Sequence, residues 1–244
     1  MNQQADVYLS VVTAAYNEAE NIANLVEQIA SALSKIEGKS EIVVVNDGSS
    51  DDTLQIAQKL MKQYPALRVI NLAHRSGQTA AIDAGFHYAQ GEYIAMLDAD
   101  LQNDPADIPR MLELLVAERC DLVNGWRKDR QDPLMRKIST KIANGVRNKL
   151  THETIHDSAC GLKVFRRKCL SQIKLYTGMH RFLPTLFRIE NFKVIEIPVN
   201  HRPRIAGKAK YGVMNRVFKA LRDTFAIRWM QSRIFHYQAK EIEP

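Results

Sequence analysis

The sequence predicts an α/β protein with a mostly parallel central sheet and helices on both faces. Three observations predict this class. Four short apolar runs alternate with segments of helical periodicity over about the first 105 residues, which is the order expected of a parallel sheet with crossover helices. Each run stops at polar or acidic residues, as strands do at the edge where such sheets bind ligands. A length of 244 residues, 45% of them hydrophobic, suffices for one large domain.

The first two strand–helix units are predicted between residue 7 and about residue 63. Residues 7–13 form an apolar run, and Asn17 is expected to cap the helix that follows. Residues 41–45 predict the second strand, and the turn at 46–53 is rich in residues that cap helices. The apolar face of the first helix recurs at helical spacing: Ile22, Leu25, Val26, Ile29 and Leu33.

The third unit leads to the stretch around which the chain is organised. Residues 67–72 predict a strand and 77–89 a helix, and the apolar run 92–97 then ends abruptly in Asp98 and Asp100. These two aspartates are two residues apart, so a turn after the strand lets both reach one cation. Oxygen ligands suit Mg²⁺ or Mn²⁺, and these cations in turn suit a diphosphate.

The second half of the chain is less regular. Residues 133–150 and the segment from 213 to about 237 predict basic amphipathic helices, and residues 193–199 predict a late strand. Helices of this composition either lie in a lipid interface or pack on the domain itself. The sequence leaves both interpretations open.

Charge divides the chain into two unlike halves. Residues 1–122 carry a net charge of −10 and residues 123–244 a net charge of +17. An acidic half suits a metal, and a basic half suits phosphates, nucleic acid or an anionic membrane surface. No run approaches the roughly 20 apolar residues of a membrane span, and residues 1–6 do not resemble a signal peptide, so we expect a cytoplasmic protein. The three cysteines are expected to be reduced thiols in or near the core.

Polar residues after three of the predicted strands should meet at one edge of the sheet. They are the segment Tyr16 to Glu18, Asp47 and the segment Asp98 to Asp100. Asp47 could accept hydrogen bonds from the imide of a uracil or from the N1–H and amino group of a guanine. The alternative is a capping aspartate, although Asp51 or Asp52 could fill that role equally well.

Together these segments resemble a known family. Tyr-Asn-Glu at 16–18, Val-Val-Asn-Asp-Gly-Ser-Ser-Asp-Asp-Thr at 44–53 and Leu-Asp-Ala-Asp-Leu-Gln-Asn-Asp-Pro at 97–105 look like the family 2 glycosyltransferases of the GT-A (Rossmann-like) fold. Three later segments, 157–167, 178–184 and 201–212, are similar to the dolichyl- and undecaprenyl-phosphate sugar transferases within that family. The resemblance covers residues 7 to 233. It implies a catalytic domain over 1–212 and a basic, membrane-proximal helical segment over 213–244.

The resemblance also implies roles for individual residues. Asp47 would bind the nucleotide base, and Asp157 would be a conformation-setting acid near the reacting sugar. The metal and the donor diphosphate would be held by Asp98, Asp100 and Gln102. Other donor contacts would come from Ala14, Tyr16, Glu18, Ala99, Arg202 and Lys208, and the acceptor phosphate would be received by Arg127, Arg136 and Ser139 or Thr140. Two positions depart from the family pattern, Ala14 where proline is usual and Ala209 where serine is usual, but neither removes a charge.

The implied reaction is an inverting, metal-dependent transfer of a sugar from a UDP- or GDP-sugar to a polyprenyl phosphate such as undecaprenyl phosphate. It would occur on the cytoplasmic membrane face and yield a sugar donor for cell-envelope glycans. A phosphate monoester has a second pKa of about 6, so it is largely dianionic at neutral pH and needs no general base. Many relatives continue into membrane-spanning helices, whereas this sequence stops at Pro244. Contact with a lipid would then depend on the amphipathic segments or on a membrane protein partner.

Rival interpretations differ in acceptor or in class. A soluble family 2 transferase acting on a saccharide or lipopolysaccharide would need a general base, for which Asp157 is the candidate. A sensor would bind the nucleotide-sugar and metal without turning it over. A nucleic-acid-binding protein is disfavoured, because the aromatic residues do not interleave with the basic ones and the acidic crevice would repel a phosphate backbone.

Overall fold

A computed structural model describes residues 7–128, 145, 148, 150, 151, 153–203, 213–235 and 240, with the backbone alone for 213–221. Seven strands form one sheet in the order β3-β2-β1-β4-β6-β5-β7. All of them point the same way except β6, which is antiparallel to both β4 and β5. The strands are β1 Leu9–Ala15, β2 Ser40–Asn46, β3 Leu67–Asn71, β4 Tyr93–Met96, β5 Leu122–Trp126, β6 Lys163–Arg166 and β7 Val194–Pro198. The helices are α1 Ile22–Leu33, α2 Thr53–Leu60, α3 Gln78–Tyr88, η1 Pro105–Asp107, α4 Ile108–Ala117, η2 Arg167–Gln172, η3 Met179–Phe182, α6 Leu183–Ile189 and α7 Val213–Arg233.

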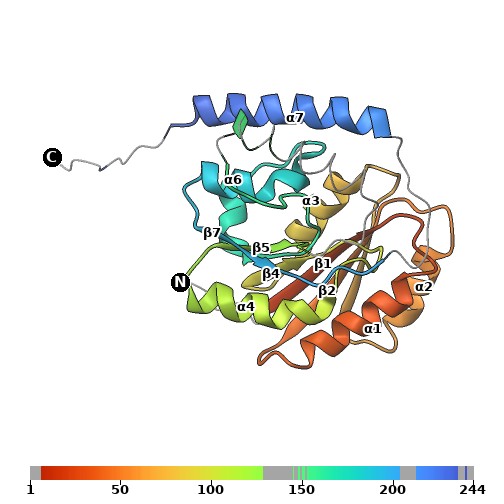
Figure 1. Ribbon diagram of the computed structural model, residues 1–244. Coiled ribbons are helices and arrows are strands. Elements are labelled where there is room, and N and C mark those ends of the chain that lie inside the picture. Colours follow the sequence, from red (N-terminus) through yellow and green to blue (C-terminus); the bar gives the residue numbers. More distant parts are fainter. Residues whose placement is uncertain are drawn as a thin grey trace.

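Helices cover both faces of the sheet (Figure 1). Alternate residues of each central strand point to opposite faces, so Val11 packs in one apolar cluster and Val12 in the other. The first cluster lies beneath α1, α2 and α4, and the second beneath α3 and α6. Because β1, β2 and β4 are covered on both sides, their sequences are near-continuous apolar runs. The predicted fold class is thereby confirmed.

The chain between β1 and α1 differs from the prediction. The helix begins at Ile22, and Asn17 lies outside it in a left-handed conformation with φ 51°. The Asn17 side chain instead bonds to Ser50, and the Glu18 N–H donates to Thr53 Oγ1 at 2.8 Å. The prediction of Asn17 as helix cap was therefore wrong, because the segment is tied to the next loop of the sheet edge. Strands β5 and β6 were not predicted.

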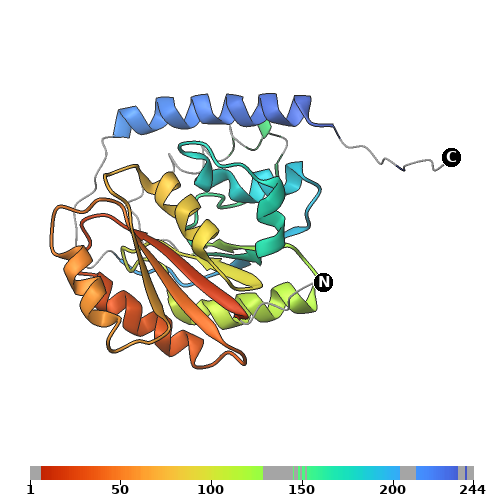
Figure 2. The ribbon, with the colours of Figure 1, turned by 180° about the vertical axis from the view of Figure 1, so that it is seen from behind.

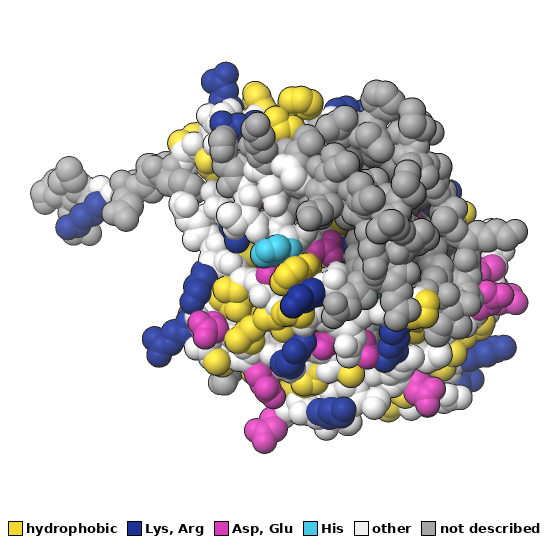
Figure 3. All heavy atoms as spheres, in the orientation of Figure 1, with side chains coloured by type: hydrophobic (Ala, Val, Ile, Leu, Met, Phe, Trp, Pro, Cys, Tyr) yellow, Lys and Arg dark blue, Asp and Glu magenta, His cyan; other side chains and the backbone are white. Residues whose placement is uncertain are grey.

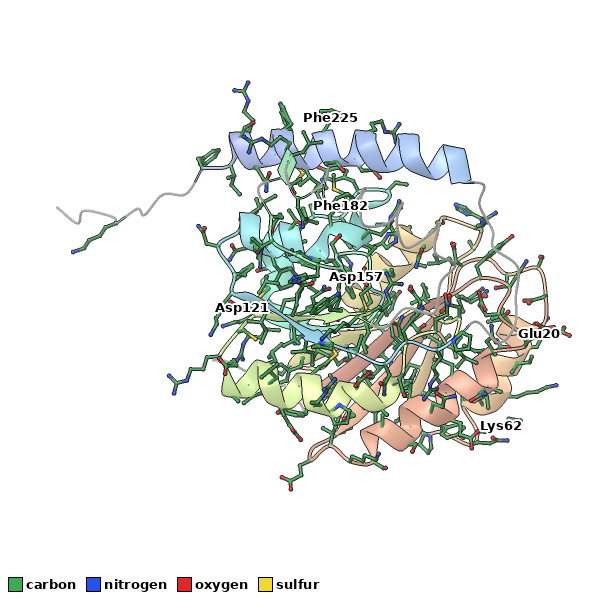
Figure 4. All side chains as sticks on the ribbon, viewed as in Figure 1. Glu20, Lys62, Asp121, Asp157, Phe182 and Phe225 are labelled. Carbon is green, nitrogen blue, oxygen red and sulfur yellow. The ribbon has the colours of Figure 1, made fainter. Side chains whose placement is uncertain are left out.

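Helix α7 lies along the outside of the layer formed by α3 and α6 (Figures 1 and 2). Its inner face contributes Ile227, which is fully buried against Phe182 and Leu186. Its outer face exposes Phe225 and Trp229, and Figure 4 shows Phe182 beneath the helix and Phe225 pointing away from it. Within the described ranges, no helix combines the length and the apolarity needed to cross a membrane.

Candidate active site

The acidic turn after β4 is the centre of the site. The strand ends at Met96, and the chain then turns at Leu101, which is buried and has φ 59°. A non-glycine residue in this region is strained, and such strain concentrates at functional sites. The turn is closed by the Gln102 N–H, which donates to Asp100 Oδ1 at 3.2 Å. Asp104 then begins the next helix by accepting from the Ala106 N–H at 3.0 Å.

Two distant segments fix the Asp98 carboxylate. The Gln78 amide, at the start of α3, donates to Asp98 Oδ1 at 2.9 Å. The backbone of Gly161 passes so close to Asp98 that a Cβ at position 161 would overlap Oδ2. A side chain at 161 would therefore displace Asp98 or Asn103, and the segment before β6 lies directly against the predicted metal ligand.

The oxygen atoms at this turn suit a magnesium-like cation. Asp98, Asp100 and Gln102 are half-buried and offer carboxylate and amide oxygens. Among the described residues, no group of three or more histidine, cysteine or acidic side chains could hold a metal by itself. The donor set fits a cation that takes one or two protein carboxylates and completes its shell with substrate phosphates and water, which is the habit of Mg²⁺.

Arg127 and Asp157 form a buried, bidentate ion pair. Arg127 Nε lies 2.7 Å from Asp157 Oδ2, and Nη2 lies 2.9 Å from Oδ1. Only 13% of the Arg127 side chain and 7% of the Asp157 side chain are exposed. Burial alone would lower the pKa of Arg127, but the hydrogen bond and charge of Asp157 outweigh it and raise that pKa above its usual value. Figure 4 shows Asp157 in the interior of the domain.

A fully buried lysine lies behind this pair. Lys163, in β6, donates from Nζ to the Cys160 carbonyl oxygen. Burial lowers the pKa of Lys163, while Asp157 and Asp98 oppose that shift electrostatically. No feature of the sequence alone singled out Lys163.

The loop after β2 meets the loop before α3. Asp47 accepts from the Ser76 N–H at 2.6 Å, and the Gly77 N–H bonds both of its oxygens. Burial tends to raise the pKa of Asp51, but hydrogen bonds from Thr53 and Ala19 outweigh it and lower that pKa. Asp52 is the N-cap residue of α2, and Asp51 Oδ1 accepts from the N–H of Thr53, the first residue of that helix, at 3.0 Å.

The aromatic ring of Tyr16 is covered by the Arg75 guanidinium, 4.1 Å from the ring centroid. Ala14 ends up half-buried in β1, and Ala99 is buried in the acidic turn. Base binding by Tyr16 and Asp47 stays a prediction. Arg75 contacts Tyr16 and Ser76 contacts Asp47, and the sequence reasoning missed both of them.

Arg202 approaches the same edge from the segment after β7. The backbone N–H of Arg202 donates to the Gln102 carbonyl oxygen at 2.9 Å. Its guanidinium lies 2.6 Å from Asp104 Oδ2 and 2.6 Å from Gln28 Oε1. A role as diphosphate clamp stays a prediction. The remaining predicted residues, Arg136, Ser139, Thr140 and Lys208, lie outside the described part of the chain.

The family model for glycosyl transferase family 2 matches residues 10–174. The chain belongs to this family. It is 39% identical over 223 residues to the dodecaprenyl-phosphate galacturonate synthase of Rhizobium johnstonii, a match that covers 90% of the chain and 66% of that protein. It is 34% identical over 212 residues to the undecaprenyl-phosphate 4-deoxy-4-formamido-L-arabinose transferase of Edwardsiella ictaluri, covering 86% and 65%. The chain thus spans slightly less than two thirds of the length of these relatives.

Solved structures of other glycosyltransferases show the same GT-A fold. The glucosyl-3-phosphoglycerate synthase of Mycobacterium tuberculosis, solved with Mn²⁺, UDP and product, has a TM-score of 0.71 at 17% identity, covering 96% of this chain and 82% of that one. A mannosyltransferase of Pyrobaculum calidifontis, solved with GDP-mannose and Mn²⁺, has a TM-score of 0.62 at 18% identity, covering 95% and 76%. The predicted family and fold are confirmed.

Proposed function

We propose that this protein transfers a sugar, with inversion, from a UDP- or GDP-sugar to a polyprenyl phosphate on the cytoplasmic face of the membrane. The relatives named above as dodecaprenyl- and undecaprenyl-phosphate sugar transferases support this acceptor class. The distant structures with bound Mn²⁺ and nucleotide support a metal-dependent nucleotide-sugar donor.

The observation that carries the choice of acceptor is the Arg127–Asp157 pair. A hydroxyl acceptor needs a general base, and Asp157 was the candidate. Both oxygens of Asp157 accept hydrogen bonds from Arg127, so this carboxylate is held as the counter-ion of a guanidinium. A phosphate acceptor needs no base, because it is already an anion at neutral pH. The pair occupies only the Nε–Nη2 edge of Arg127, and the Nη1 edge of a guanidinium can still bind a phosphate oxygen.

The chain's own residues would then divide the work. Asp98, Asp100 and Gln102 would hold Mg²⁺ or Mn²⁺, which when bound neutralises charge developing on the leaving diphosphate. Arg127, together with Arg136 and Ser139 or Thr140, would orient the acceptor phosphate for in-line attack. Lys208 and Arg202 would bind the donor diphosphate, and Asp47 and Tyr16 the base.

The outer face of α7 supports contact with an anionic membrane surface. Arg222, Phe225, Trp229 and Arg233 recur at spacings of three and four residues, opposite the buried Ile227. The aromatic side chains are 60% and 63% exposed. Figure 3 shows hydrophobic and basic side chains gathered along this outer edge. Exposed aromatic residues flanked by arginines suit a lipid interface, so α7 would both pack on the domain and place it at the membrane.

Nucleoside diphosphate release by the purified protein tests the proposal. A panel of UDP- and GDP-sugars, including UDP-galacturonate, is assayed with Mn²⁺, with and without undecaprenyl phosphate in detergent. We expect release that depends on the lipid phosphate and is lost in Asp100→Ala and on chelation of the metal. Release that is indifferent to the lipid but stimulated by a saccharide would refute the acceptor assignment, and binding without turnover would indicate a sensor.

A further inference from the structure

The segment that carries Asp157 has no regular secondary structure to hold it. Residues 153–162, between the helical residue 151 and β6, form turns and irregular backbone. Their backbone N–H groups therefore depend on other acceptors for hydrogen bonds, and buried N–H groups are almost always paired. The residue that supplies those acceptors therefore determines the positions of Asp157 and its partner Arg127.

The Glu196 carboxylate accepts from two of these N–H groups. Glu196 Oε2 accepts from the His156 N–H at 2.8 Å, and Glu196 Oε1 accepts from the Asp157 N–H at 3.2 Å. Glu196 Oε2 also lies 3.0 Å from His156 Nδ1, and Oε1 accepts from Asn124 Nδ2 at 3.0 Å. Only 11% of the Glu196 side chain is exposed. Hydrogen bonds to an ionised acceptor are shorter and stronger than neutral ones, so this is a strong anchor.

The sheet places Glu196 for this task. It lies in β7, the edge strand, opposite Asn124 of β5. Its neighbours Ile195 and Ile197 pack on the cluster beneath α1 and α4, so the alternation of a strand turns Glu196 to the other face. On that face Glu196 contacts the irregular segment. Asn124 Nδ2 also donates to the Asp157 carbonyl oxygen at 3.0 Å.

We propose that Glu196 is a positioning residue for the Arg127–Asp157 pair. Its carboxylate fixes the backbone of His156 and Asp157, Asp157 fixes the guanidinium of Arg127, and the orientation of that guanidinium sets the phosphate-binding edge. His156 is held from a second side by stacking on Trp126, with ring centroids 4.3 Å apart. The link to sugar transfer rests on the function proposed above, whereas the link between Glu196 and the segment does not.

Replacement of Glu196 by glutamine tests the effect of Glu196 on the segment separately from its effect on sugar transfer. Glu196→Gln keeps the shape but turns one acceptor into an NH₂ group that faces N–H donors. The matched control is Glu113→Gln, since Glu113 is exposed on α4. We expect amide hydrogen exchange in residues 153–159 to become at least about tenfold faster in Glu196→Gln and to stay unchanged in Glu113→Gln. Equal exchange in both variants would overturn the proposal, whatever the enzyme's substrates.

Kinetics then test the consequence for transfer. We expect Glu196→Gln to lower kcat at least about tenfold, with KM for the nucleotide-sugar changed less than about twofold. In an Asp157→Asn background the same substitution should have little further effect, because it acts through Asp157. If instead each substitution lowers kcat by the same factor whether or not the other is present, Glu196 has a general structural role and the positioning assignment is overturned. Absence of lipid-dependent turnover in the unmodified protein would count against the proposed function alone, and the exchange result would still decide the role of Glu196.

Discussion

His180 should make the stability of the fold depend on pH in a defined window. This histidine lies in η3, and its Nδ1 is 2.7 Å from Thr79 Oγ1. The Gly178 N–H donates to the same hydroxyl oxygen at 2.9 Å, and the tautomer of the ring decides whether Thr79 Oγ1 or His180 Nδ1 is the donor between them. Burial, together with the charges of Arg181 and Lys163, lowers the pKa of His180 to about 3.

The sign and size follow from proton linkage. The ordinary pKa of histidine, 6.5, applies to the unfolded chain, and the folded value is lower. Between these two pH values the unfolded chain binds the extra proton and the folded chain does not. The contribution of neutral His180 to the unfolding free energy is therefore fully present above pH 6.5 and is lost as the pH falls below that value. Lowering the pH from about 7 to about 5 should remove roughly 2 kcal/mol of unfolding free energy at this one residue.

Urea unfolding of the wild type and His180→Asn at several pH values isolates this contribution. Asparagine keeps an acceptor near the position of Nδ1 but cannot take up the proton. Other titrating groups cancel in the difference between the two proteins. We expect the wild type's advantage to shrink by about 2 kcal/mol between pH 7 and pH 5, while the exposed-site control His74→Gln keeps the wild-type pH dependence. A difference that stays constant with pH would refute the reasoning. If His180→Asn does not fold, an NMR titration that shows His180 protonated at pH 5 in the wild type would refute it equally.

Three further predictions follow from the structure. Gly161→Ala should displace Asp98 and lower kcat/KM for transfer by at least about a hundredfold with an unchanged circular dichroism spectrum. Gly145→Ala, where a Cβ has no described atom within 4 Å, should not lower it. The double variant Phe225→Ser and Trp229→Ser should bind anionic vesicles at least about tenfold more weakly in a flotation assay, and Tyr88→Ser, an exposed aromatic on α3, should bind as the wild type does. All three cysteines are buried, and burial raises the pKa of Cys160 to about 11 and of Cys169 to about 12, so iodoacetamide should label them only in urea; labelling of the native protein at neutral pH would contradict this.

The first half of the fold was predictable because each strand is a continuous apolar run with polar residues at its end. Asp98 and Asp100 stood out for the same reason, since they directly follow the apolar run of β4. Strand β5 was not predicted because Asn124 and Gly125 interrupt its apolar run. Strand β6 was not predicted because Lys163 occupies a fully buried position in it, whereas lysine is typical of protein surfaces. Local sequence rules fail most often where function overrides them.

Much of the site could not be predicted, because it depends on contacts between distant parts of the chain. Nothing near Glu196 in the sequence indicates that its carboxylate receives the N–H groups of residues 156 and 157; that contact follows from the register of β5 with β7. Gln78 likewise reaches Asp98 only because α3 starts at the edge where β4 ends. Gly161 carries no local turn signal that explains it, and its close approach to Asp98 appears only in the structure.

The reversed strand β6 explains how these contacts become possible. In a parallel sheet, the segments that follow the strands meet at the ligand-binding edge, as those after β1, β2, β4 and β5 do here. Because β6 runs the other way, the segment that precedes it, residues 157–162, reaches that edge as well. A β6 parallel to its neighbours would carry this segment to the opposite edge, about 13 Å away for four residues at roughly 3.3 Å each. Asp157 would then lie far from Arg127, and Gly161 far from Asp98. The reversed direction of β6 in the described sheet is therefore the feature of the topology that brings the Arg127–Asp157 pair against the acidic turn.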